Sequence, residues 1–413
     1  MQIDKLKTFI QSSNINFLFG SGLSSPYLKT LGNVEKWLTD LNNIDNIDVS
    51  IKTIVEASIY KTYFEQVIYP NSKTINDRDY DNVFGNYKTF LTTWNDIVNK
   101  RANKLLCKQL NIYTTNIDTF VEKAAADTLI EFNDGFKGSI NQKFNEGNFQ
   151  KSFSKTSLHY QNTFELPVFN LLKMHGSINW QEKDGIIYND VGLKQIENIQ
   201  EKLQRIDDEY FVRIEEQQID EEQIDEEQID EEQIDEEQII KNFIKDAWKI
   251  KTNYSTVKFN EIYNEFLVEY RKLIIVNPTK RKFSETVMDI HFYELIRMFS
   301  NSLEKESSVL FVMGFSFADE HIREITLRAA NTNPTLEIII FSHGEQYEHK
   351  EMSLNAINSN IFIVYVDDFK KNNKKEEGVT EKIKEWKCFD FKTINQVFSI
   401  INKKIPAING QRY

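Results

Sequence analysis

The stretch FLFGSGLSS, residues 17–25, runs from apolar side chains directly into two glycines that flank a serine. The apolar residues before the glycines predict a short buried strand over 15–19, and Gly20, Ser21 and Gly22 predict the turn that follows it. Glycines at such a turn allow the backbone to approach a flat or anionic group, typically a pyrophosphate at a helix N-terminus. The stretch therefore predicts the first strand and a nucleotide-binding loop of an α/β fold.

An ordinary strand-to-helix turn would use the same residues, so the glycines alone leave both interpretations open. A hydride-transferring dinucleotide fold also requires an acidic residue about 20 positions further on, at the end of the second strand. The nearest candidates, Glu35 and Asp40, belong to a segment with a helical pattern. This placement weighs against a dehydrogenase.

Further apolar runs alternate with longer helical patterns along the chain. They are rich in Ile, Val, Leu and Phe without strict alternation, which is typical of a parallel sheet that is covered on both faces. The predicted architecture is a doubly wound, mostly parallel α/β sheet of the Rossmann-like kind, with helical insertions at about 33–106 and 181–266. We expect one nucleotide-binding domain over residues 1–370 and a C-terminal helical extension over 371–413. The predicted strands after the first are 110–113, 169–174, 273–276, 309–313, 336–341 and 361–366.

Polar residues follow the second of these runs in the segment NIYTTNIDTFVEKAA, residues 111–125. Thr115, Asn116 and Asp118 lie between the strand and a helix that we expect to begin near Thr119, at the edge where open α/β sheets bind ligands. An amide and a carboxylate two residues apart suit a ribose and a carboxamide. Asp118 is alternatively a helix N-cap.

Two later strands end in the same way. NLLKMHGSINW, residues 170–180, leads into His175 and Gly176. A lone histidine is more often structural, as we expect for His291, but an imidazole at a strand terminus can act as a general base near physiological pH. VLFVMGFSFADEHI, residues 309–322, places Gly314 and Ser316 after its strand, where the backbone can donate to a phosphate or a ribose. The segment 338–345 has the same form.

Composition sets few limits on the partners of the protein. The net charge of -13 arises from residues 215–238, which hold 14 acidic side chains and no basic ones, so the rest of the chain is close to neutral. Within that tract the isoleucines recur every five residues and would scatter around a helix, which predicts a solvated helix or loop. Nucleic acid is not indicated as a partner, because the basic cluster at 280–282 stands alone.

The chain shows no apolar run long enough to span a bilayer and no signal-peptide pattern at residues 1–13, so we expect a cytoplasmic protein without a membrane partner. Cys107 and Cys388 are the only cysteines and lie far apart. They predict neither a disulfide framework nor a structural zinc site.

Taken in order, these motifs resemble the sirtuin family, and most closely its bacterial sirtuin-like, NAD-hydrolysing branch. The resemblance covers roughly residues 10–366 and implies a sirtuin-type fold. The segment 20–24 is similar to the glycine-rich loop over the NAD pyrophosphate, and 115–118 to the T-x-N-x-D motif. His175 and Gly176 are similar to the catalytic His-Gly pair, and 314–316 to a later loop near the nucleotide. The matching positions, by implication, are Asn116 and His175 for catalysis and Gly20, Ser21, Gly22, Ser24, Thr115, Asp118, Gly314 and Ser316 for binding NAD.

One departure from the family pattern bears on the activity. Protein-deacylating sirtuins usually carry four zinc-binding cysteines after the catalytic histidine, whereas this chain has no cysteine between Cys107 and Cys388. We therefore expect no zinc, and an NAD glycohydrolase that releases nicotinamide and ADP-ribose. The resemblance implies that Asn116 positions the ribose and water, that His175 accepts a proton, and that Asp118 binds the nicotinamide amide.

The same resemblance implies a setting for the enzyme. Members of this branch often deplete NAD in antiphage defence, as abortive infection, and tend to form homo-oligomers. Some act with a separately encoded hexameric ATPase or another activating protein, which is the kind of partner that we expect. Two alternatives stay open: a zinc-free NAD-dependent deacylase or ADP-ribosyltransferase, and a non-catalytic NAD or ADP-ribose sensor. NAD consumption without a protein acceptor would favour the glycohydrolase over the deacylase or transferase. A chain that does not turn over NAD would indicate the sensor.

Overall fold

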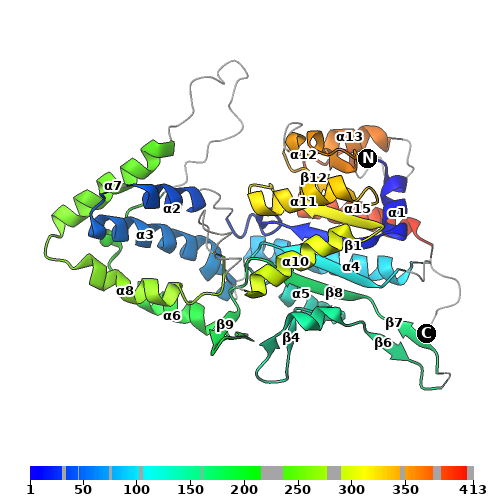
Figure 1. The fold of residues 1–413 in the computed structure, drawn as a ribbon, viewed down its shortest axis with the longest axis horizontal. Coiled ribbons are helices and arrows are strands. Elements are labelled where there is room, and N and C mark those ends of the chain that lie inside the picture. The colour runs from blue at the N-terminus through cyan, green and yellow to red at the C-terminus, as the bar shows by residue number, and fades with distance from the viewer. Residues whose placement is uncertain are drawn as a thin grey trace, which may run out of the picture.

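The computed structural model describes residues 1–29, 34–44, 46–73, 77–101, 106–159, 161–214, 236–276, 290–344, 349–374 and 383–406. A sheet of seven strands forms the centre of one part of the molecule (Figure 1). Its strands are β1 (Asn14–Phe19), β2 (Gln109–Thr114), β3 (Phe132–Asn133), β8 (Val168–Lys173), β11 (Ser308–Met313), β12 (Glu337–Phe341) and β13 (Ile361–Val364).

The strands lie in the order β13–β12–β11–β1–β2–β8–β3, and every neighbouring pair is parallel. The chain starts at β1 in the middle, moves outward through β2 to β8, and then returns to β11 on the other side of β1. Apart from the short edge strand β3, this is the strand order of a dinucleotide-binding Rossmann fold. The strands that precede β11 in the sequence lie on one side of β1, and β11 and the strands after it lie on the other, so the strand order reverses between β1 and β11. The prediction of a doubly wound parallel sheet is confirmed, and ligands bind such sheets at the carboxyl ends of the strands beside that reversal.

Both faces of the sheet are buried, which explains why its strands read as continuous apolar runs. Phe17 and Phe311 stack on one face with ring centroids 5.8 Å apart. Leu18 and Val312, their neighbours along the two strands, pack into a separate core on the other face. A fully buried apolar side chain contributes roughly 1.5–3 kcal/mol to stability, so these paired positions hold the centre of the sheet rigidly.

Helices cover the two faces. Trp94 lies 4.8 Å from the Phe17 ring and 4.7 Å from the Phe398 ring, so helices from distant parts of the sequence meet over β1. The first face carries α1 (Ile3–Ser12), α4 (Arg78–Asn99), α5 (Phe120–Thr128) and α15 (Phe391–Lys404). The second face carries α10 (Ile290–Glu304) and α11 (Glu320–Thr332), and α12 (Lys350–Leu354) packs against β13.

A second part of the molecule is helical and buries its own core. It joins α2 (Val34–Asn43) and α3 (Val49–Tyr63) from the first predicted insertion to α6 (Lys194–Leu203), α7 (Glu236–Asn253) and α8 (Phe259–Tyr270) from the second. Figure 1 shows these helices together at one end of the molecule, beside the sheet. We call this group the helical unit. Two insertions that are far apart in the sequence therefore form one structure.

Small antiparallel elements complete the fold. They are a four-stranded sheet of β4 (Phe136–Lys137), β5 (Lys143–Phe144), β10 (Ile186–Asn189) and β9 (Trp180–Lys183), and a hairpin of β6 (Ser154–Thr156) and β7 (Thr163–Glu165). A short helix, α13 (Val366–Asn372), follows β13. Among the helices of the described ranges, none has both the length and the apolar character that crossing a bilayer requires.

One sequence-based expectation needs correction. The predicted strand at 273–276 is irregular backbone with a single bridge from Ile275 to Gly176, because its apolar side chains fill the contact between the helical unit and the sheet. Within the predicted C-terminal extension, α15 buries Phe391 and Phe398 in the main core against α4. The acidic repeat up to residue 235, the basic cluster at 280–282 and Glu345 lie outside the described residues.

Candidate functional site

A cavity of about 620 Å³ opens at the carboxyl ends of the central strands, beside the reversal between β1 and β11. Loops after β1, β2, β8, β11 and β12 line it, and the helical unit adds Tyr63 and Val67. All of the predicted site residues except Gly20 line this one cavity: Ser21, Gly22, Ser24, Thr115, Asn116, Asp118, His175, Gly314 and Ser316. Since they come from loops that lie up to about 300 residues apart in the sequence, only the fold brings them together.

The two glycine loops of the cavity pack backbone against backbone. A Cβ atom on Gly20 would lie 2.2 Å from the carbonyl oxygen of Gly314, and Gly314 itself has a φ of +60°. The N–H groups of Gly20 and Gly22 donate to Met313 O and Gly314 O, each at 3.1 Å. These glycines therefore serve the junction of the two loops, and the N–H groups of Gly20 and Gly22 are already engaged within the protein.

The loop after β2 is anchored to the same junction. Asn116 donates from Nδ2 to Gly20 O at 3.0 Å, and its own N–H donates to Thr114 Oγ1 at 2.9 Å. The Asn116 Oδ1 atom is buried and has no hydrogen-bond partner within the described residues. The Tyr87 hydroxyl lies close enough to interact with Asn116, but the pair does not reach hydrogen-bond geometry. A buried acceptor without a partner is costly, which marks Asn116 as a site that a ligand hydroxyl or a water can satisfy.

Asp118 is a buried carboxylate at the inner end of the cavity. Its Oδ2 accepts a hydrogen bond from Ser24 Oγ at 2.7 Å, and its Oδ1 accepts one from the N–H of Phe120 at 3.1 Å, in the first turn of α5. Burial, assisted by the negative charge of Asp118, raises the pKa of Tyr63 to about 12 and that of Tyr87 well above its ordinary value. Both phenols therefore stay protonated beside the carboxylate. The N-cap of α5 is Thr119 rather than Asp118, so the N-cap alternative is wrong, although Asp118 still accepts from the first turn of the helix. Asp118 also joins the loops after β1 and β2.

A buried lysine fixes the position of this loop relative to β8. Lys173, with 3% of its side chain exposed, donates to Glu122 at 2.9 Å, to Ser177 Oγ at 2.8 Å and to the carbonyl of Asp118. Burial raises the pKa of Glu122, an effect that the ion pair with Lys173 opposes. Ser177 Oγ in turn donates to Ile117 O at 3.2 Å. These contacts set the loop that carries Asn116 against the turn that carries His175.

The turn after β8 needs its glycine. Gly176 has a φ of +74°, and a Cβ atom there would lie 2.0 Å from the carbonyl oxygen of Ile274. The irregular segment before residue 277 clamps the turn from outside, because Val276 N donates to His175 O at 2.9 Å and Ser177 N donates to Ile274 O at 3.1 Å. The His175 backbone is thereby held in the wall of the cavity.

Across the cavity His175 contacts a carboxylate from the loop after β11, which lies on the other side of β1 from β8. His175 Nε2 lies 3.1 Å from Asp319 Oδ2, and the two side chains are only 12% and 13% exposed. Asp319 is the N-cap of α11, where its Oδ1 accepts hydrogen bonds from the N–H groups of His321 and Ile322 at 3.1 and 3.2 Å. A carboxylate fixed in this way orients the imidazole, and with the proton on Nε2 the Nδ1 atom keeps its lone pair.

Several residues of the cavity belong to none of the sequence motifs. Asp319 precedes a helix and reads as a cap, whereas its contact with His175 depends on how β8 and β11 are arranged. Tyr63 belongs to a predicted insertion, and it reaches the cavity because the helical unit packs beside the sheet. His343 and His349 line the wall after β12. His343 alone could have been found from the sequence, because the segment 338–345 has the pattern of a strand followed by polar residues.

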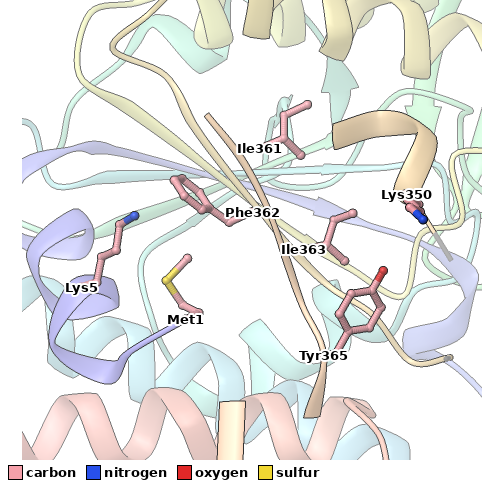
Figure 2. Close-up of a pocket in the computed structure, with 7 residues that line it drawn as sticks. All are labelled: Met1, Lys5, Lys350, Ile361, Phe362, Ile363 and Tyr365. Atoms are coloured by element: carbon pink, nitrogen blue, oxygen red, sulfur yellow. The ribbon is translucent and has the colours of Figure 1, made fainter. Parts of the chain in front are cut away.

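Neither a group of metal ligands within the described residues nor a second cavity competes with this site. The part of the chain that the structure describes contains no cluster of three or more His, Cys, Asp or Glu side chains suited to a metal ion, and neither Cys107 nor Cys388 lines the cavity. A separate cavity of about 520 Å³ lies at the β13 edge (Figure 2), where Lys5 Nζ lies 3.9 Å from the centroid of the Phe362 ring and Lys350 lies on the far side of Ile363. None of the motif residues lies there, so we assign the candidate site to the cavity beside β1 and β11.

Fold and cavity together define a Rossmann-like α/β protein with a candidate ligand site where its strand order reverses. No protein-family model matches the chain, and no curated protein matches it.

Proposed function

We propose that the protein is an NAD glycohydrolase, which cleaves NAD to nicotinamide and ADP-ribose. The observation that carries the proposal is that Asn116 and His175, from the carboxyl ends of the adjacent strands β2 and β8, line one cavity at the nucleotide-binding edge of a Rossmann-like sheet. Amide and imidazole groups at that position suit hydrolysis of a ribosyl bond, which needs orientation and a proton acceptor more than it needs a metal.

The reaction breaks the bond between C1′ of the ribose and the pyridinium nitrogen of nicotinamide. The bonding electron pair moves to that nitrogen, so the cationic ring leaves as neutral nicotinamide. A water oxygen then forms a bond to C1′, and the proton that this water loses passes to His175. The products are nicotinamide and ADP-ribose, with one proton released to solvent when His175 is regenerated.

Each group has a place in this scheme. Asn116, whose Oδ1 lacks a partner, accepts a hydrogen bond from a ribose hydroxyl or from the water. His175 accepts the proton, and Asp319 is a positioning residue that holds the ring and stabilises its protonated form. Both oxygens of Asp118 are engaged by Ser24 and Phe120, so we propose that it shapes the nicotinamide end and meets the carboxamide only at its edge.

We further propose, from the resemblance to the sirtuin-like branch, that the activity depletes NAD in antiphage defence and responds to an activating partner. Tyr63 and Val67 support control of this kind, because they place the helical unit on the wall of the cavity. A partner that displaces the helical unit would alter the site directly.

The test measures nicotinamide release by chromatography for the wild-type protein, His175→Ala and Asn116→Ala. The reactions contain candidate activators and no protein acceptor. We expect each substitution to lower turnover by about a hundredfold or more. His159→Ala is the matched control, because His159 is exposed near the β6–β7 hairpin and does not line the cavity. Folded variants that turn over NAD at the wild-type rate would contradict the catalytic assignment, and an inactive wild type that still binds NAD would favour a sensor.

A further inference from the structure

A row of asparagines crosses the sheet from its central strand to one edge. Asn111 Nδ2 donates to Asn16 Oδ1 at 3.0 Å, and Asn170 Nδ2 donates to Asn111 Oδ1 at 2.9 Å. Asn133 Nδ2 donates to Asn170 Oδ1 at 3.0 Å and ends the chain at β3. Each of these residues lies directly opposite the next across the parallel pairs of β1, β2, β8 and β3. The four residues, which we call the asparagine row, thus link four strands side chain to side chain.

The asparagine row lies in the interior of the protein. Asn16, Asn170 and Asn133 are at most 7% exposed, and Asn111 is partly buried. Asn16 is two residues from Leu18, so it faces the same core, on the side of the sheet that α10 and α11 cover. Amides buried there need hydrogen-bond partners, whereas apolar side chains of similar volume do not. Buried polar groups of this kind contribute little net stability, and their best-attested role is to specify register.

The apolar pattern of the neighbouring strands is compatible with more than one register. β8 is buried at all six of its positions, so a shift by two residues exchanges one buried apolar side chain for another. In a parallel pair this shift is roughly 6.6 Å. It would bring Asn111 opposite Val168 or Leu172 instead of Asn170, and the amides would lose their partners. The asparagine row therefore penalises a shift that the apolar pattern tolerates.

The same two strands carry the proposed reacting groups. Asn116 follows Asn111 by five residues, and His175 follows Asn170 by five residues. We infer that the asparagine row fixes the register of β1, β2 and β8, and that Asn111 and Asn170 are thereby positioning residues for Asn116 and His175. A shift by two residues would displace Asn116 from His175 along the strands by the same roughly 6.6 Å. The register part of the inference stands alone, and the positioning part rests on the proposed function.

The test replaces the central row by apolar side chains in the full-length protein, as the triple variant Asn16→Val, Asn111→Val and Asn170→Val. Asn133 keeps a partner there, because its Nδ2 also donates to Asn148 O at 3.0 Å. Methyl NMR spectra of Ile15 and Ile112, the neighbours of the row on β1 and β2, report the register without any substrate. We expect the urea midpoint to stay close to that of the wild type and these methyl groups to show more than one set of resonances.

Turnover provides the second measurement. The kcat for nicotinamide release by the triple variant should fall about threefold to tenfold, the population shift that corresponds to one hydrogen bond, with KM unchanged in the fraction that keeps the native register. Asn111→Val alone leaves Asn16 Oδ1 and Asn170 Nδ2 without partners and should lower the urea midpoint further than the triple variant does. Asn395→Val is the matched control, because Asn395 is 3% exposed in α15 and donates to Asn86 O, outside the sheet. It should show one set of resonances and the wild-type kcat.

Two results would overturn the inference. One set of resonances with wild-type kcat in the triple variant would show that the contacts of Lys173 and the connecting segments suffice to set the register. A triple variant that unfolds at a lower urea concentration than Asn111→Val would show that the row supplies stability instead. The methyl spectra need no substrate, so a wild type that never hydrolyses NAD would overturn the proposed function while the register result stands.

Discussion

Replacing Gly20 with alanine places a methyl group 2.2 Å from the carbonyl oxygen of Gly314 and 2.6 Å from the Cα atom of Phe315. Both atoms belong to the backbone, so no side chain can rotate away. Because real Cβ contacts essentially never fall below 3.0 Å, the two loops must separate by at least 0.8 Å. That shift strains the hydrogen bonds from Gly20 N to Met313 O and from Gly22 N to Gly314 O.

The magnitude follows from these two terms. Forcing one methyl group into a packed site costs about 1–3 kcal/mol, and each weakened hydrogen bond adds about 1 kcal/mol. We therefore expect Gly20→Ala to lower the free energy of unfolding by about 3 kcal/mol. Gly85→Ala is the matched control, because Gly85 lies inside α4 and its added methyl group would meet nothing within 4 Å. That substitution should stabilise the protein by up to about 1 kcal/mol.

Equilibrium unfolding in urea, monitored by circular dichroism, compares the two variants with the wild type in the absence of any ligand. Hydrogen exchange at residues 20–24 shows whether the change is centred on the loop junction. If Gly20→Ala unfolds at the wild-type urea concentration and only loses affinity for ADP-ribose, the glycine serves the ligand, and the argument from loop packing is refuted.

Three further outcomes follow from the structure. Asp319→Asn keeps a cap on α11 but removes the charge beside His175, so turnover should fall at least tenfold and its pH profile should shift, whereas a merely structural role would leave that profile in place. Chelation of zinc should leave NAD turnover unchanged, and stoichiometric zinc whose removal abolishes activity would instead support a deacylase-like site. The free energy of unfolding should fall as the pH rises from about 10 to 12, because burial raises the folded-state pKa of Tyr63 to about 12 and the unfolded chain releases its phenolic protons first. Urea midpoints that stay constant over that pH range would contradict the burial of the Tyr63 hydroxyl.

Much of the sheet could be predicted from local pattern. The strand positions at β1, β2, β8, β11, β12 and β13 agree with the predicted apolar runs to within a few residues, because strands that are buried on both faces need uninterrupted apolar side chains. The same pattern was misleading at 273–276. An apolar run of four residues can fill an interface as well as a sheet, and here Ile275 bridges only to Gly176.

Larger groupings depended on contacts that sequence patterns do not encode. The predicted insertion at 33–106 divides: α2 and α3 join the helical unit, while α4 packs on the sheet with α15. Each of these helices has an apolar surface, but that surface does not specify which part of the molecule covers it.

The sequence by itself determined that polar residues follow buried parallel strands, and hence that Asn116, His175 and Gly314 would gather at one edge, because the carboxyl ends of parallel strands share an edge. Only the tertiary structure decided how these residues are partnered. It engaged the glycine N–H groups in a loop junction, placed Asp319 at 3.1 Å from His175, and brought Tyr63 in from the helical unit. Such contacts join segments hundreds of residues apart, and they arise from backbone approach and packing geometry, which local sequence patterns leave undetermined.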